Sequence, residues 1–280
     1  MSVGALGGIA WWASRQHAPH VAFARGSVAA LVGALGLYAV ATALRAERWH
    51  RILVRSRLDR GRAESYRLTT VGYMGNNVLP ARAGDLLRCV MLGGPRRAVL
   101  GTAVAERLLD VAALAAIFAA VVVQRGLSFG PLPYVAAALA AVLALAALAV
   151  RLRRFGRARA WLAPLAGASR ELVGVHGALL LALSVAIWAV EGCVYLTVGL
   201  AASVHLGVAG ALYVVALTNL SMVIPAAPGY VGTFDAAVVL ALRSLSLPAV
   251  GYLLLLRFVL FVPITVVGFV FFVARRRRPA

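Results

Sequence analysis

Residues 78–85 read VLPARAGD, and residues 223–230 read VIPAAPGY, so that Pro-Ala-x-x-Gly interrupts an apolar run twice. Proline removes a helix hydrogen bond, and glycine adopts backbone angles that other residues avoid. Backbone polar groups that are freed inside a bilayer must be buried in protein or line a cavity. Paired breaks in the two halves of a membrane protein are typical of a transporter's central site. The sequence therefore predicts two broken helical elements.

Composition places the whole chain in a membrane, because 62% of its residues are hydrophobic and its mean hydropathy is +0.91. At about 20 residues per span, 280 residues leave room for about six to eight membrane segments. No soluble catalytic domain of ordinary size fits beside them. We therefore predict an all-α, polytopic integral membrane protein with one domain over residues 1–280, and we expect no enzyme. Its two cysteines match no metal or redox spacing, and no metal or cofactor is expected.

The net charge of +19 comes from arginine, since the chain contains no lysine. Most of the arginines lie between apolar runs, where the positive-inside rule accounts for them. A basic membrane surface attracts anionic lipid head groups. We accordingly expect anionic membrane lipids as partners, and no nucleic acid.

Charge also orients the apolar runs. The runs expected to span the bilayer are 27–44, 98–123, 132–150, 177–202 and 249–273. The basic stretches between them, 45–67 and 151–159, and the tail 275–278 are predicted to be cytoplasmic, in the cytoplasmic membrane of a prokaryote. Residues 3–13 are too short to span and are either a truncated first span or a surface helix. Residues 151–175 are expected to form an interfacial amphipathic helix.

Two broken pairs interrupt this order. Residues 64–95 are predicted to form a re-entrant hairpin that enters and leaves on the cytoplasmic side. Residues 207–247 form either a second hairpin, entering from outside, or two full spans. With two hairpins, the tips meet near the midplane, as alternating access requires. The expected break residues are Pro80, Gly84, Pro225, Pro228, Gly229 and Gly232.

Charged side chains inside these segments cost about 2.5–3.5 kcal/mol each, so each needs a partner or a function. Glu106 and Asp110 lie on one helix face, and Arg107 can pair with Asp110. This trio is either a set of structural ion pairs or part of a binding site. Glu191, inside the run 177–202, is another such charge.

The first break carries Arg82, Asp85 and Arg88. Arginine offers a planar fork that matches phosphate oxygens. A short helix that starts near Gly84 would point backbone N–H groups at an anion. Asp85 is either a residue of the helix N-terminus or the partner of an arginine.

Asp235 follows the second break and is the counter-ion of Arg82, the counter-ion of Arg257, or a proton-coupling carboxylate. Arg48 and Trp49 are interpreted as an interfacial anchor at the inner end of the first span. The residues predicted to bind substrate are Asn77, Arg82, Asp85, Arg88, Glu106, Arg107, Asp110, Asp235 and Arg257.

Four motifs in order carry a family resemblance. They are Arg48-Trp49, Asn77-x-x-Pro80-x-Arg82-x-Gly84-Asp85-x-x-Arg88, Glu106-Arg107-x-x-Asp110, and Pro225-x-x-Pro228-Gly229-x-x-Gly232-x-x-Asp235. Over residues 30–273 the chain resembles the flippase-like family built on the transmembrane region of lysylphosphatidylglycerol synthase. The resemblance implies a candidate role for Arg82, Asp85, Glu106, Arg107 and Asp235. The family usually has glutamate where this chain has Asp85 and Asp235.

In the best-understood members of that family, the membrane region moves a lysine-modified phospholipid that a fused soluble domain makes. Other members are linked to glycan or hopanoid-lipid pathways. Because this sequence holds no transferase domain, we expect no lysyl-lipid synthesis. It also contains no nucleotide-binding loop, so any energy coupling is expected to use an ion gradient.

The expected function is flippase-like translocation of an anionic amphipathic lipid, such as a phospholipid or a polyprenyl-phosphate-linked glycan. In this mechanism the head-group phosphate engages Arg82 and Arg88. One alternative is a membrane partner that transports nothing and anchors a glycosyltransferase or a lipid-modifying enzyme. Another is an integral-membrane transferase that uses Asp85 or Glu106 as a base.

Overall fold

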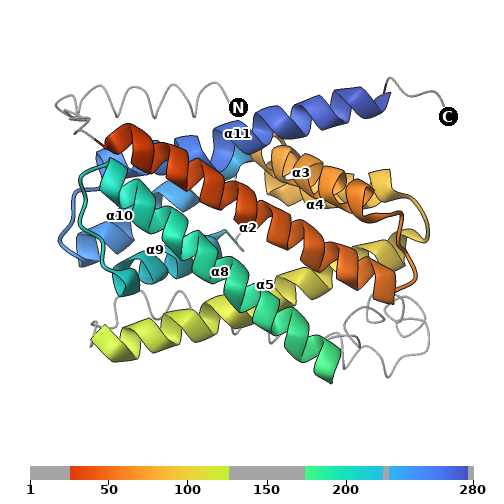
Figure 1. Ribbon diagram of the computed structural model, residues 1–280, viewed down its shortest axis with the longest axis horizontal. Helices are drawn as coiled ribbons and strands as arrows, with labels where there is room; N and C mark the ends of the chain where they lie inside the picture. The colour runs from red at the N-terminus through yellow and green to blue at the C-terminus, as the bar shows by residue number, and fades with distance from the viewer. Residues whose placement is uncertain (1–25, 126–173, 223–226, 277–280) are drawn as a thin grey trace.

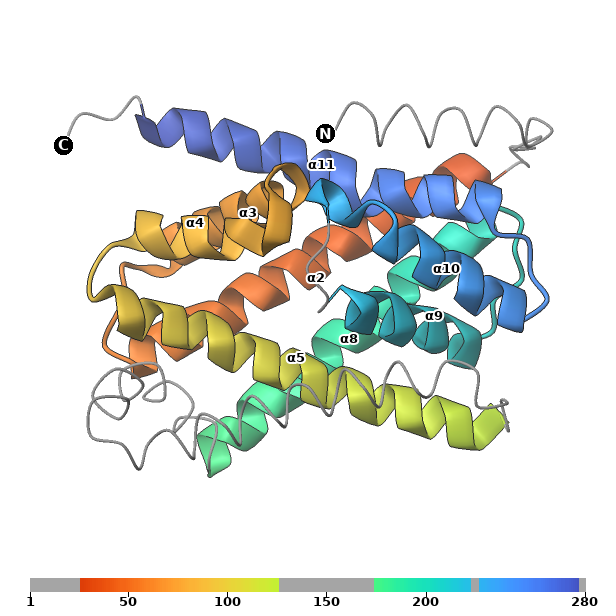
Figure 2. The same cartoon turned by 180° about the vertical axis from the view of Figure 1, so that it is seen from behind.

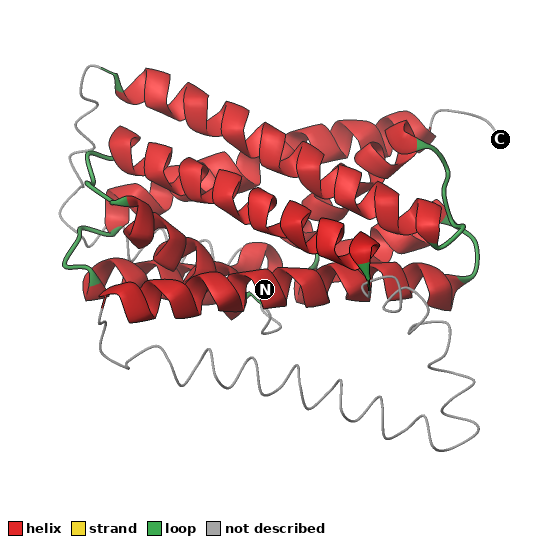
Figure 3. Ribbon diagram, turned by 60° about the horizontal axis from the view of Figure 1, so that its bottom comes forward, coloured by secondary structure: helices red, strands yellow, loops and turns green. Residues whose placement is uncertain are grey.

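The computed structural model describes residues 26–125, 174–222 and 227–276, and every regular element in these ranges is helical (Figure 3). The segment 3–13, the span 132–150, the interfacial helix up to residue 173 and Pro225 lie outside the described residues. The described elements, in chain order, are α2 (Ser27–Arg55), α3 (Arg62–Val78), the 3-10 turn η1 (Pro80–Arg82), α4 (Ala83–Leu92), α5 (Arg96–Arg125), α8 (Val175–Ala201), α9 (Val208–Ser221), the 3-10 turn η2 (Pro228–Tyr230), α10 (Thr233–Ser244) and α11 (Val250–Arg276).

Among the described helices, α2, α8 and α11 are long and apolar enough to cross a membrane. The 27 residues of α8 extend about 40 Å, more than the hydrocarbon core of about 30 Å. Helix α5 is 30 residues long and carries the charges of Glu106, Arg107 and Asp110. The predicted all-α, polytopic fold is confirmed. Helix α2 continues past the apolar run 27–44 to Arg55.

The helices form one bundle, seen from two sides in Figures 1 and 2. Its largest apolar core joins α5, α8, α9, α10 and α11 around Tyr213, Phe234 and Tyr252. A smaller apolar cluster, around Trp49 and Leu68, joins α2, α3, α4 and α5. Figure 2 shows the C-terminal ends of α2 and α11 at the same end of the bundle as the N-terminal end of α5. That arrangement agrees with the orientation expected from the basic stretches.

Two broken pairs, α3–η1–α4 and α9–η2–α10, bring their breaks together between the two ends of the bundle. Figure 2 shows the pairs entering from opposite ends, and η1 contacts η2 where they meet. Helices α4, α9 and α10 have 10, 14 and 12 residues and so extend about 15–21 Å. None of the three reaches across a hydrocarbon core of about 30 Å. For residues 207–247 these lengths favour a broken pair over two full spans.

The two breaks share a local geometry in the described residues, and this geometry pairs Pro80 with Pro228, whereas the sequence match paired Pro80 with Pro225. Each 3-10 turn starts at a proline after an extended residue, as sterics before proline require, and Pro228 is the described counterpart of Pro80. The third residue of each turn, Arg82 or Tyr230, is left-handed, with φ of 58° and 54°. Such angles are uncommon for residues other than glycine and store strain.

Gly84, expected to provide an unusual backbone angle, instead lies inside α4 and permits a close crossing with α3. A Cβ atom on Gly84 would lie 2.0 Å from the carbonyl oxygen of Gly72 and 2.3 Å from the backbone nitrogen of Asn76. Gly268 of α11 also approaches α3 closely, since a Cβ atom there would lie 2.4 Å from the Cβ of Met74 and 2.7 Å from the carbonyl oxygen of Thr70. Small residues that let helix backbones approach are typical of packing within membranes.

Gly84→Ala is therefore expected to lower the stability of the purified protein, because the added methyl group meets backbone atoms that cannot rotate away. Overpacking of this kind costs about 1–3 kcal/mol. The midpoint of thermal unfolding in detergent measures the effect. Gly36→Ala, on a helix position with no atom within 4 Å of the added Cβ, is the matched control and should not lower the midpoint. Equal midpoints for the two variants would contradict the close crossing.

Candidate functional site

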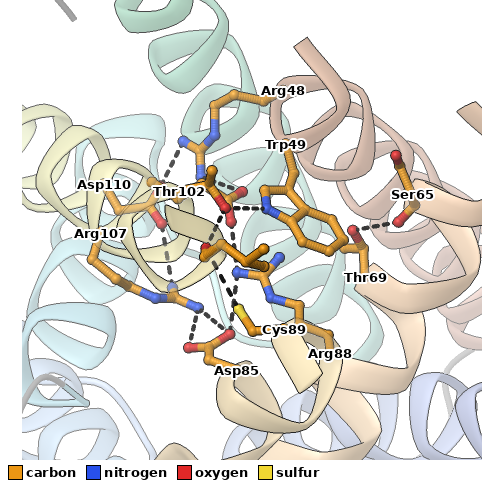
Figure 4. A network of polar contacts seen from close by, with 12 residues as sticks. Arg48, Trp49, Ser65, Thr69, Asp85, Arg88, Cys89, Thr102, Arg107 and Asp110 are labelled. Carbon is orange, nitrogen blue, oxygen red and sulfur yellow. Dashed lines mark hydrogen bonds and ion pairs between the residues drawn. The ribbon is translucent and has the colours of Figure 1, made fainter. Parts of the chain in front are cut away.

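Six charged side chains of alternating sign close into a ring between α2, α4 and α5 (Figure 4). Helix α2 supplies Arg48, α4 supplies Asp85 and Arg88, and α5 supplies the other three. The shortest N–O distances around the ring are 2.8 Å for Arg107–Asp85, 3.3 Å for Arg107–Asp110, 2.7 Å for Arg48–Asp110, 3.6 Å for Arg48–Glu106, 2.6 Å for Arg88–Glu106 and 3.3 Å for Arg88–Asp85. Three arginines balance three carboxylates, so the ring is formally neutral.

Burial makes this balance necessary, since an unpaired charge in the interior is very costly. The side chains of Arg48, Arg88 and Glu106 are 1%, 4% and 4% exposed. Arg48 also donates a hydrogen bond to the hydroxyl of Ser184 on α8, over 2.7 Å. The ring thus ties four helices together.

The interpretation of Arg48 and Trp49 as an interfacial anchor is wrong, because both side chains are buried. The indole N–H of Trp49 donates to the hydroxyl of Thr102 over 3.0 Å. The Arg88 guanidinium lies 4.5 Å from the centre of the Trp49 ring, a cation–π contact. Both residues support the ring because α2 continues past residue 44 into the bundle.

The predicted pairing of Arg107 with Asp110 is confirmed, at 3.3 Å. Asp85 takes both of the roles that the sequence left open. It lies in the first turn of α4, where its backbone N–H donates to the side-chain oxygen of Asn76, and it pairs with Arg107. Arg88 is enclosed by Asp85, Glu106 and the Trp49 ring.

At the second break, Asp235 pairs with Arg257 at 2.5 and 2.8 Å, which identifies Arg257 as its counter-ion. Arg257 also donates to the carbonyl oxygen of Gly229 over 3.2 Å, and Asp235 accepts the N–H of Gly232 over 2.9 Å. Asn77 joins the end of α3 to α11 by donating to the hydroxyl of Thr265 over 2.8 Å. These contacts hold the two breaks in place.

A cavity of about 70 Å³ lies between the breaks. Since one water needs about 10–15 Å³ of such space, the cavity has room for several waters or for part of a polar head group. Its walls are aromatic and polar, and they bring together residues of both breaks. The lining residues are Tyr38, Arg45, Tyr73, Asn76, Asn77, Arg82, Arg107, Asp110, Trp188, Glu191, Asn219, Met222, Tyr230, Phe234, Leu260 and Phe261.

Arg82 differs from the other arginines of this cavity because no carboxylate of the described residues lies within ion-pair distance. One of its terminal nitrogens donates to the carbonyl oxygen of Met222 over 3.0 Å, and its guanidinium lies 5.5 Å from the centre of the Tyr230 ring. Its Nε has no partner in the described part of the chain; nor do the Nε of Arg107 and the indole nitrogen of Trp188. The cavity wall therefore holds buried donors in excess.

Sequence reasoning missed the pair of Arg45 and Glu191, which are 2.5 Å apart and both buried. Arg45 begins the basic stretch 45–67 that the sequence predicts to be cytoplasmic, yet its guanidinium lies 5.0 Å from the centre of the Trp188 ring. One signal pointed to this pair. An acidic residue inside an apolar run requires a cation nearby, and α2 carries Arg45 and Arg48 on one face.

Comparison with protein-family models matches residues 1–268 to the lysylphosphatidylglycerol synthase TM region. The match begins earlier than the resemblance carried by the four motifs, and it includes both breaks and the charged ring. Neither curated proteins nor solved structures gave a match.

Proposed function

The chain belongs to the lysylphosphatidylglycerol synthase transmembrane-region family, and on that basis we propose that it translocates an anionic amphipathic lipid by binding the head-group phosphate between the two breaks. One observation carries the proposal: among the described residues, the buried side-chain atoms of the cavity wall that have no partner are all N–H donors, on Arg82, Arg107 and Trp188. Leaving buried donors unsatisfied is costly, and a ligand rich in acceptor oxygens satisfies them.

Charge supports the same ligand class. Of the described residues, three arginines and two carboxylates line the cavity, and together they carry a formal excess of one positive charge. Arg82 supplies that excess because its partners are a carbonyl oxygen and an aromatic ring. Guanidinium groups match phosphate oxygens in geometry, and their charge-assisted hydrogen bonds are roughly twice as strong as neutral ones.

The broken helices fit a route across a bilayer. Helices α4 and α10 begin directly after the breaks, so their positive N-terminal ends lie close to the cavity. We propose that both pairs are re-entrant from opposite faces, with the basic end and the C-terminus in the cytoplasm of a prokaryote. The phosphate then crosses at the breaks, where access can alternate, while the acyl or polyprenyl chains remain in lipid.

Mass spectrometry of co-purifying lipids tests this proposal. The wild type is expected to enrich one anionic lipid, and Arg82→Asn should reduce that enrichment about tenfold or more, because a hydrogen bond to a charged group is worth about 1.5–3 kcal/mol. Asparagine is chosen since it tolerates the left-handed angle at this position. Arg243→Asn, at the exposed end of α10, is the control for charge. An Arg82→Asn variant with the lipid profile of the control would refute the proposed site.

A further inference from the structure

We propose that Asp85 occupies the position on Arg107 that the phosphate of the ligand takes during binding. Arg107 then exchanges a carboxylate of its own chain for the phosphate of the ligand. The inference rests on the proposed function of the cavity. It means that Asp85 competes with the ligand for Arg107, and that binding of the head group moves α4.

Arg107 is the ring member placed to make this exchange. Its side chain is 30% exposed, whereas the other two arginines of the ring are 1% and 4% exposed. Of these three arginines, only Arg107 lines the cavity. One terminal nitrogen contacts both oxygens of Asp85, at 2.8 and 3.1 Å, while its Nε has no partner among the described residues. A phosphate group offers the same paired oxygens as a carboxylate.

The ring can open at this edge without leaving a buried charge unpaired. After the exchange, Arg107 retains Asp110 at 3.3 Å and gains the ligand. Asp85 retains Arg88 at 3.3 Å and its position in the first turn of α4, where a negative charge is favourable. The ligand is favoured over Asp85 because it contacts Arg82 and Arg107 together and offsets the repulsion between them.

Exchange also changes how α4 is held. The Arg107–Asp85 pair is one of two links of the ring between α4 and α5, and the other is Arg88–Glu106. Helix α4 is the second half of the first broken pair, so loosening it alters the geometry of the break beside the cavity. Binding of the head group and movement of α4 are thereby coupled through one arginine.

The affinity of the full chain in nonionic detergent for short-chain phosphatidylglycerol tests the exchange. Asp85→Asn is expected to lower Kd about tenfold, which corresponds to about 1.4 kcal/mol. Glu47→Gln is the matched control, because the side chain of Glu47 is 16% exposed and that of Asp85 is 17% exposed. Glu47 pairs with Arg51 and Arg62 and lies outside the cavity lining. Equal gains in both variants, or no gain in Asp85→Asn, would overturn the proposal. Inorganic phosphate is measured as a second ligand to distinguish a phosphate group from a lipid head group. If Asp85→Asn binds both ligands more tightly, the phosphate group alone accounts for the gain in affinity. If it binds only the lipid more tightly, the whole lipid head group is required.

Two further measurements keep the proposal testable if Asp85→Asn folds poorly. In an Arg107→Gln background, Asp85→Asn should produce no gain, since the competition acts through Arg107. In the wild type, adding phosphatidylglycerol should speed hydrogen exchange of the α4 amides, and unchanged or slower exchange would overturn the exchange model. If Arg82→Asn loses binding and Asp85→Asn gains no affinity, the exchange at Arg107 is refuted but the proposed function is not. Retained binding in Arg82→Asn removes the proposed function as well.

Discussion

Arg48→Leu is expected to destabilise the protein by about 3–5 kcal/mol, the cost of removing one partner from a buried ion pair. Arg48 is 1% exposed and contacts Asp110 at 2.7 Å and Glu106 at 3.6 Å. Without it, three carboxylates share the two remaining arginines of the ring. Those carboxylates must bind protons, attract water or separate. The variant should show a markedly lower midpoint of thermal unfolding in detergent and a reduced yield of monodisperse protein.

Arg51→Leu provides the control, because it removes the same charge from the same helix. Arg51 is 42% exposed and pairs with Glu47 at 3.0 Å, four residues away. Exposed pairs of this kind contribute about 0–1 kcal/mol. If Arg48→Leu were no more harmful than Arg51→Leu, the charged ring could not be a buried structural element.

The sequence predicted which charged residues belong to this site better than it predicted which residues they pair with. Helical spacing placed Glu106 and Asp110 on one face and Arg107 within reach of Asp110, and the contact between Arg107 and Asp110 depends on local geometry alone. The partners of these residues come from α2 and α4, and no local pattern indicates which helices will pack together. Arg48 was misjudged for this reason: at the end of an apolar run, arginine is typical of the membrane surface.

The breaks show the same limit. Pro80 predicted where α3 stops, and Pro228, Gly229 and Gly232 predicted the second break, because their backbone chemistry acts locally, whereas Gly84 lies inside α4. The equivalence of Pro80 with Pro228 depends on the shape of the turn that follows each proline, and the letters VLPA and VIPA favoured Pro225 instead. The left-handed angle at Arg82 was not foreseen either, since it is sustained by contacts with Met222 and Tyr230 across the cavity.

After each break an aspartate in the first helical turn pairs with an arginine of another helix. Asp85 pairs with Arg107 within a larger ring, whereas Asp235 and Arg257 form a pair enclosed by Phe234 and Phe261. The first break is thus held by charged residues that have alternative partners, whereas the second break is held by a single ion pair. This asymmetry makes the first break the better candidate for movement.

A second large effect is expected at the pair of Arg45 and Glu191, which joins α2 to α8. Glu191→Leu leaves the guanidinium of Arg45 buried with the rings of Trp188 and Tyr73 as its neighbours. Cation–π contacts contribute about 0.5–2 kcal/mol, which is less than the 3–5 kcal/mol or so that an orphaned buried charge costs. The single variant should therefore unfold at a much lower temperature than the wild type.

The double variant Arg45→Leu/Glu191→Leu is expected to recover most of this loss. Replacing both members of a buried ion pair by apolar residues is often neutral or stabilising, because the desolvation cost of both charges disappears together. The comparison of single and double variants in thermal unfolding isolates the coupling between the two charges. A double variant as unstable as Glu191→Leu would mean that Glu191 acts through contacts other than Arg45. Recovery would instead show that this pair can be removed as a unit, because its two charges need only each other.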